Sequence, residues 1–239
     1  MKWSHEYTVN SNDTDMNGIV GAGAMLRYMQ DAANWQMETQ GPSYDELLDS
    51  GNAFVITRLA LSLYAPLRTH EPITAQSWAV ASRGVIYNRC YRVLRGEDIV
   101  AEAVSAWALI NTETRRPRRV GEIPLNYSED EMLELDLPLR MKIPPEISLN
   151  LVGERTIQYA DADRNFHLNN TRYPDMFCSF LPTMAHKRVI SFNINFLSEA
   201  LLGETEKIYL GTDDDTYYFR SVRPSGAVNA EAEILLEDL

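Results

Sequence analysis

An internal repeat restricts the folds open to this sequence more than any other feature. Four polar residues near the N-terminus recur at one constant offset of 148 residues: Thr8, Asp13, Asp15 and Asn17 correspond to Thr156, Asp161, Asp163 and Asn165. Such spacing is the signature of a duplicated structural unit. The chain has 239 residues, of which 45% are hydrophobic, so each of two copies can bury a core.

The first copy, like the second, is expected to fold as a strand, a long helix and then a run of antiparallel strands. Residues 24–40 contain neither Gly nor Pro and place apolar side chains at helical spacing, before Gly41 and Pro42 end the helix. Four strand-like runs follow, with short turns between the last three. These runs are residues 54–64, 73–82, 85–94 and 99–110.

The second copy repeats this order in a shorter form. A helix is expected near residues 173–181, and strands are expected near residues 189–197, 207–212, 217–222 and 228–236. Between the copies lies a proline-rich linker with a short acidic helical stretch at residues 128–135. We therefore predict an α+β fold of two tandem hotdog domains, each an antiparallel sheet wrapped around a long helix, paired as a pseudo-dimer. The predicted boundaries are 1–114, 115–150 for the linker and 151–239.

Composition argues against several classes of protein. The formal net charge of −12 would repel a phosphate backbone, so no nucleic-acid partner is expected. The sequence has neither a run of about 18 apolar residues nor a secretory pattern, so we expect a cytoplasmic protein without a membrane partner. Cys90 and Cys178 lie far apart without metal-binding companions, and we expect neither a metal nor another cofactor.

Candidate chemistry gathers around one of the four histidines. His167 follows Asp163 and Asn165 at alternate positions, and in an extended segment these three side chains would face the same space. A helix capped by Asn170 or Thr171 would begin directly afterwards, so its free N–H groups would suit a developing oxyanion. The alternative is that these residues only build a turn and a helix cap. Desolvating so many polar groups beside an apolar strand costs free energy, which favours a functional role for them over a purely structural one.

The repeat helps to separate these two interpretations. At the same offset, three residues of the second copy have apolar or small counterparts in the first: His167 corresponds to Ile19, Asn169 to Gly21 and Asn170 to Ala22. A purely structural role would be expected in both copies. We therefore expect the second copy to be catalytic and the first to shape the binding cavity.

The same residues carry a resemblance to a known family. The run from Asp163 to Asn170, followed by Tyr173, resembles the D-x-N-x-H-x-N-N-x-x-Y motif of the acyl-ACP thioesterases of plant plastids and bacteria, whose chains are double hotdogs. Residues 105–111 and 114–116 also resemble the end of that family's first hotdog. Together with the repeat, the likeness covers essentially the whole chain.

This resemblance implies hydrolysis of fatty acyl thioesters carried on acyl carrier protein, a reaction of fatty acid biosynthesis. It implies a catalytic glutamate one strand beyond the histidine, and Glu199 occupies that position. The expected catalytic set is Asp163, Asn165, His167 and Glu199, with Glu199 and His167 activating a water. Direct attack by the carboxylate to form an anhydride is left open. Plant members often have cysteine after this glutamate, where this chain has Ala200, so no cysteine nucleophile is expected there.

The substrate is expected to meet two further groups of residues. Near the polar turn, these are Asn169, Asn170 and Tyr173. At the start of the linker, a basic cluster could dock the acidic carrier protein, because local complementarity can outweigh net repulsion; it contains Arg115, Arg116, Arg118 and Arg119. The alternative is a solvated basic linker.

Other functions stay open on the sequence alone. A hotdog protein of this kind could act on acyl-coenzyme A, hydrate an acyl chain, or bind acyl thioesters as a sensor without turning them over. Carrier preference, acyl chain length and the presence of a homodimer are also left open.

Overall fold

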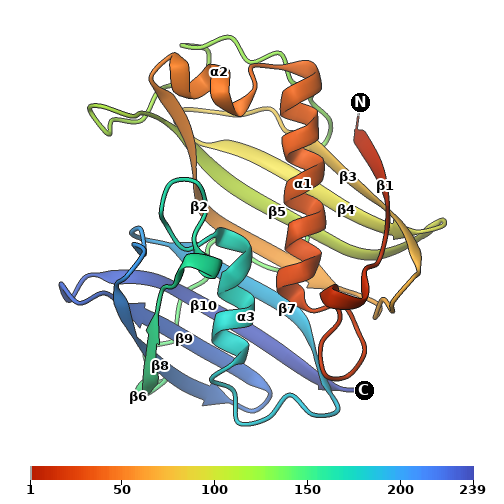
Figure 1. The fold of residues 1–239 in the computed structure, drawn as a ribbon, viewed down its shortest axis with the longest axis vertical. Helices are drawn as coiled ribbons and strands as arrows, with labels where there is room; N and C mark the ends of the chain where they lie inside the picture. The colour runs from red at the N-terminus through yellow and green to blue at the C-terminus, as the bar shows by residue number, and fades with distance from the viewer. Residues whose placement is uncertain (1) are drawn as a thin grey trace.

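The computed structural model describes residues 2–239 and shows two similar halves that share one sheet (Figure 1). Ten strands form this antiparallel sheet in the order β1-β3-β4-β5-β2-β7-β10-β9-β8-β6. The first half contributes β1 (Trp3–Thr8), β2 (Asn52–Leu63), β3 (Pro72–Ala79), β4 (Tyr87–Arg95) and β5 (Asp98–Asn111). The second half contributes β6 (Asn150–Thr156), β7 (Lys187–Phe196), β8 (Thr205–Asp213), β9 (Thr216–Val222) and β10 (Val228–Asp238).

The two halves join where β2 pairs with β7. This antiparallel register runs from Arg58 opposite Asn195 to Ser62 opposite Ser191. On either side of it, each half is an antiparallel sheet that curves around its own helix (Figure 1). The predicted α+β fold of two hotdog units paired as a pseudo-dimer is therefore confirmed.

The helices differ more between the halves than the sheets do. Helix α1 (Ala22–Gln40) agrees with the prediction and buries a face that includes Met25 and Met29 against the sheet. Its counterpart α3 (Tyr173–Cys178) has only six residues, after a short 3-10 turn. The helix expected near residues 173–181 is present but ends at Cys178, and Pro182 restricts the residue directly before it to non-helical backbone. A further helix, α2 (Tyr44–Asp49), was not predicted.

The segment between β5 and β6 is extended, and its middle part packs on the face of the first half that carries Trp78. Within the described residues it contains no helix, so the acidic helix expected at residues 128–135 was wrong. Leu133 and Leu135 instead pack against the buried cluster around Trp78. Their spacing of two suits an extended chain with one apolar face. Further along, Asn193 and Asn195 of β7 donate side-chain hydrogen bonds to backbone carbonyls of this segment at 2.5 and 2.9 Å.

The main core lies between the helices and the concave face of the sheet, and it is continuous across both halves. No helix within residues 2–239 combines the length and the apolar character that crossing a membrane requires.

Candidate active site

The polar turn of the second copy is closed by its own aspartate. Asp163 Oδ1 accepts hydrogen bonds from the backbone N–H groups of Asn165 and His167, at 2.8 and 3.2 Å. The Asp163 N–H in turn donates to the His167 carbonyl at 2.8 Å. The segment is therefore a tight turn, and the expectation of an extended run with three side chains on one face was wrong.

The first copy repeats this turn bond for bond. Asp15 Oδ1 accepts from the N–H groups of Asn17 and Ile19, at 2.8 and 3.4 Å, and the Asp15 N–H donates to the Ile19 carbonyl at 2.8 Å. Both turns need one residue with positive φ, which is Gly18 at 71° in the first copy and Phe166 at 62° in the second. The aspartate thus forms the turn in each half, while the imidazole belongs to the second half alone.

Glu199 lies just beyond the end of β7, on a segment fixed by a buried asparagine. The backbone carbonyl of Asn229 accepts from the N–H groups of Leu197 and Ser198, and its side-chain Nδ2 donates to the Ser198 carbonyl at 2.6 Å. Asn229 Oδ1 accepts from the hydroxyls of Tyr173 and Ser221, at 3.0 and 2.7 Å. The carboxylate therefore extends from a backbone that has little freedom to move.

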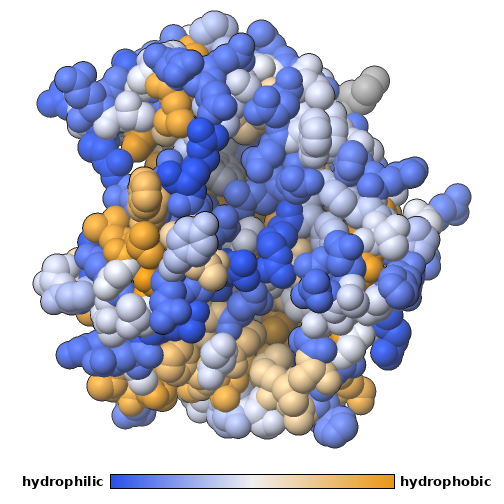
Figure 2. Space-filling view, viewed as in Figure 1, coloured by the Kyte–Doolittle hydropathy of each residue, from blue (hydrophilic) through white to orange (hydrophobic). Residues whose placement is uncertain are grey.

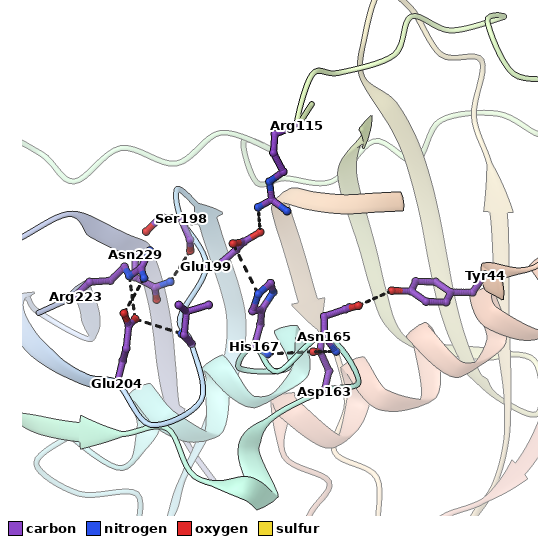
Figure 3. A network of polar contacts seen from close by, with 11 residues as sticks. Tyr44, Arg115, Asp163, Asn165, His167, Ser198, Glu199, Glu204, Arg223 and Asn229 are labelled. Atoms are coloured by element: carbon purple, nitrogen blue, oxygen red, sulfur yellow. Dashed lines mark hydrogen bonds and ion pairs between the residues drawn. The ribbon is translucent and has the colours of Figure 1, made fainter. Parts of the chain in front are cut away.

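Two backbone hydrogen bonds join the polar turn to the Glu199 segment. Leu168 N–H donates to the Ala200 carbonyl and Leu202 N–H donates to the Phe166 carbonyl, both at 2.8 Å. They bring His167 Nε2 to 3.7 Å from Glu199 Oε2 (Figure 3). This separation is too long for a direct hydrogen bond, yet a single water can contact both atoms. The two side chains are partly accessible, at 27% for His167 and 35% for Glu199.

The other carboxylate oxygen of Glu199 pairs with Arg115 (Figure 3). Arg115 follows the end of β5 with positive φ, and its N–H donates to the Asn111 carbonyl at 2.9 Å. A turn of the first half therefore holds a guanidinium over a carboxylate of the second half. Of the other residues of the basic cluster, Arg118 binds Asn52, whereas Arg116 and Arg119 are exposed.

Helix α2 of the first half also contacts the polar turn. The Tyr44 hydroxyl donates to Asn165 Oδ1 at 2.9 Å (Figure 3). Next to this contact, Arg164 pairs with Asp45 at 2.7 Å and lies 4.6 Å from the centre of the Tyr44 ring. Because its Oδ1 is occupied, the Asn165 side chain keeps its N–H groups available as donors.

The three residues expected near the substrate have different surroundings. The Asn169 N–H donates to the Asp161 carbonyl, and its Oδ1 caps the following turn by accepting from Thr171, so its N–H is not available for an oxyanion. Asn170 lines the adjoining pocket. Tyr173 is only 2% exposed and reaches the site only through Asn229, and burial raises the pKa of its hydroxyl. This placement fits a positioning role better than contact with substrate.

A pocket of about 770 Å³ adjoins the polar turn. The polar turn contributes Asp163, Asn165, Asn169 and Asn170 to its lining, and the other lining residues come from α1, α2, strands β2 to β5 with their loops, and the segment between the halves. His167 and Glu199 are not among its lining residues and flank it through the same turn. In Figure 2 this face is notched between the two halves, and both hydrophobic and hydrophilic side chains border the notch.

Two hotdog units in one chain, with a polar turn beside a pocket of about 770 Å³, define a double-hotdog protein. The model of the acyl-ACP thioesterase N-terminal domain family matches residues 1–124. This match spans more than half of the chain, and the chain belongs to the acyl-ACP thioesterase family.

One curated relative and two solved structures are similar to this chain. The chain is 21% identical over 185 residues to the chloroplastic palmitoyl-acyl carrier protein thioesterase of Gossypium hirsutum; the match covers 72% of this chain but spans less than half, 45%, of that protein. An acyl-ACP thioesterase from Bacteroides thetaiotaomicron superposes with a TM-score of 0.88 at 21% identity, covering 99% of this chain and 98% of that one. A 12:0-ACP thioesterase from Umbellularia californica superposes with a TM-score of 0.79 at 15% identity, covering 100% of this chain and 98% of that one. These superpositions establish the shared fold.

Sequence reasoning missed two residues that shape the site. Tyr44 lies on α2, and the pattern from Ser43 to Glu46 is a helix-start signal that would have predicted this helix, though not its contact. Asn229 is a polar residue in an apolar strand, fully buried, and no local pattern distinguishes it.

Proposed function

We propose that the chain hydrolyses fatty acyl thioesters of acyl carrier protein at the junction of its two halves. The observation that carries this proposal is the convergence of His167 and Glu199, from two separate segments, beside the large pocket. Membership of the acyl-ACP thioesterase family supports the class of reaction. The first half supplies most of the pocket lining, which supports its role in shaping the cavity and that of the second half in catalysis.

In the proposed mechanism, one water lies between His167 Nε2 and Glu199 Oε2. Glu199 accepts a proton as the water oxygen attacks the thioester carbon, and the carbonyl electron pair moves onto its oxygen. The Asn165 amide, fixed by Tyr44, and the Asn170 N–H are the candidate donors to this oxyanion. When the carbonyl re-forms, the C–S bond breaks and the thiolate receives the proton through His167. Arg115 fixes the orientation of the Glu199 carboxylate, and Asp163 holds the turn.

Replacing the proposed base and its partner tests this assignment. We expect His167→Asn and Glu199→Gln each to lower kcat by about 10²- to 10⁴-fold, the usual contribution of general base catalysis, without unfolding the protein. Thiol release from acyl carrier protein thioesters measures the effect. The matched control is His186→Asn, an exposed histidine with positive φ that asparagine tolerates. Wild-type turnover in either site variant would refute the assignment, and an acyl-enzyme anhydride trapped by hydroxylamine would refute the water mechanism.

The basic residues at the start of the linker are proposed to contact the carrier. Arg115 and Arg118 have hydrogen-bond or ion-pair partners within the chain, so replacing them would also disturb those contacts. The exposed Arg116 and Arg119 are therefore the better residues for this test. We expect the combined changes Arg116→Ser and Arg119→Ser to raise KM for the carrier-protein thioester several-fold and to leave a small pantetheine thioester unaffected. Arg140→Ser, an exposed arginine of the same segment, is the control. An unchanged KM for the carrier substrate would remove this docking site.

A further inference from the structure

A buried arginine lines the large pocket away from the polar turn. Arg89 on β4 is only 9% exposed. Its Nη1 donates to Gln36 Oε1 at 2.5 Å and to Ser77 Oγ at 2.8 Å, and both acceptors are neutral. Within residues 2–239 no carboxylate forms an ion pair with it, and burial lowers the pKa of its guanidinium.

The rest of the Arg89 guanidinium has no hydrogen-bond acceptor among the described residues. A guanidinium carries five N–H groups, and those on Nη2 and Nε are left over after Nη1 has bonded. The Tyr127 ring lies 5.7 Å away and contributes only a weak cation–π contact. Neither nitrogen is among the enclosed, unpartnered polar atoms of the described residues, so both are open to the pocket that Arg89 lines. An oxygen of a bound ligand can therefore accept from them, and a negatively charged one would also supply the counter-ion that Arg89 lacks.

Arg92 shows how the same strand places an arginine that serves the fold alone. Three residues further along β4, its Nε and Nη2 both donate to Glu102 Oε1, at 2.7 and 2.5 Å. Glu102 lies directly opposite on β5 and satisfies the charge. Arg89 faces the neutral Ser105 at its own position on β5, so the cross-strand neighbour leaves its charge unmatched.

Arg89 lies three strands away from β7, the strand that leads to Glu199. In the sheet register Arg89 lies opposite Ser105 on β5, which lies opposite Leu59 on β2, which lies opposite Ile194 on β7. Three strand spacings therefore separate Arg89 from the strand that leads to Glu199, on the order of 14 Å. The same pocket is lined by Asn165 of the polar turn and by Arg89 on β4.

We propose that this pocket selects acyl thioesters whose acyl chain carries an oxygen acceptor, a hydroxyl or a carboxylate, near the end remote from the thioester. This inference rests on the proposed function for the direction in which the chain enters. The oxygen accepts from Nη2 and Nε of Arg89, and a methyl-ended chain leaves these donors without a partner. A chain that ends in a carboxylate binds more tightly than one that ends in a hydroxyl, because the carboxylate also supplies the negative charge that Arg89 lacks.

Pantetheine thioesters test the selectivity without involving the carrier protein. Acyl chains of matched length ending in methyl, hydroxyl or carboxylate are compared by kcat/KM over a range of lengths. We expect an oxygen-ended chain of the fitting length to be preferred by about tenfold or more, the usual effect of a hydrogen bond to a charged group. Arg89→Met should abolish or reverse this ratio, Arg89→Lys should keep part of it, and the control Arg92→Met should leave it unchanged. Because the ratio is taken within one preparation, partial unfolding of a variant cancels.

Binding of non-hydrolysable analogues separates this inference from the proposed function. Calorimetry uses pantetheine amides of the same methyl-, hydroxyl- and carboxylate-ended acyl chains, in which an amide replaces the thioester, so no turnover is required and the methyl-ended probe has no free carboxylate. Tighter binding of the oxygen-ended amides to wild type but not to Arg89→Met supports the inference even if every thioester is left intact, an outcome that would refute only the proposed hydrolysis. Equal binding of all three amides by wild type, or a preference that survives in Arg89→Met, would overturn it.

Discussion

Glu206 on β8 is a buried carboxyl group outside the proposed catalytic set. Neither of its side-chain oxygens has a hydrogen-bond partner among residues 2–239. Burial, and secondly the nearby charge of Glu204, raise its pKa to about 7 from an ordinary value of 4.5. The folded protein therefore holds this group in its protonated form well above the pH at which the unfolded chain releases the proton.

This shift predicts a pH dependence of stability. A raised pKa in the folded state gives a contribution that is complete below about pH 4.5 and is lost as the pH rises through about 7. Glu206→Gln should remove this dependence and raise the free energy of unfolding at pH 8 by up to roughly 3 kcal/mol relative to wild type. Urea denaturation at pH 5 and pH 8 measures it, with the exposed Glu154→Gln as control. An equal difference between Glu206→Gln and wild type at both pH values would contradict the prediction.

Some residues of the proposed site could be predicted from the sequence, and others could not. His167 and Asp163 stood out through the repeat, and Glu199 through the resemblance. The pairing of Arg115 with Glu199 and the contact of Tyr44 with Asn165 join residues 84 and 121 positions apart in the chain. Such contacts depend on how the two halves pack, and no local pattern encodes that.

Among the elements, α2 is the helix that contacts the proposed active site from the first half. A capping box fixes its start, in which Ser43 Oγ accepts from the Glu46 N–H and Glu46 accepts from the Ser43 N–H. Its first residue, Tyr44, reaches across to the polar turn of the other half. The helix therefore acts as a fixed support for the Asn165 amide.

Removing this support should affect the chemical step more than binding. Tyr44→Phe deletes one hydrogen bond, worth about 1 kcal/mol, so we expect kcat to fall roughly five- to tenfold with KM nearly unchanged. Thiol-release kinetics measure both parameters. Tyr64→Phe, which removes a tyrosine hydroxyl bound to Glu102, provides the control. If KM rose while kcat stayed constant, Tyr44 would act in binding rather than in positioning Asn165.

The accuracy of each predicted element follows from the strength of its pattern. Helix α1 and the strands have clear periodicity and lie close to the expected residues. The acidic segment at residues 128–135 has helix-forming composition, but its leucines alternate, and packing on the cluster around Trp78 selects the extended form. Periodicity in the sequence was thus enough to predict whether most segments form a helix or a strand. Where the sequence fits both, tertiary contacts determine which one forms.

Over the whole molecule, the duplication explains why one set of catalytic groups is expected. A smaller pocket of about 460 Å³ adjoins the turn of the first copy, where Asp15 and Ile19 contribute to the lining. It has the same turn geometry but an apolar side chain in place of the imidazole. The two halves thus keep a common framework, and only the second joins a histidine to a glutamate.

In the proposed mechanism His167 and Glu199 act on one water as a single unit. A double-mutant cycle of kcat for release of thiol from an acyl carrier protein thioester tests this most directly, using His167→Asn, Glu199→Gln and the two combined. Residues that act as a unit are strongly non-additive, so we predict that the double variant retains nearly the rate of the slower single variant. Losses that multiply in the double variant would show that the two side chains act independently and would contradict the proposed mechanism.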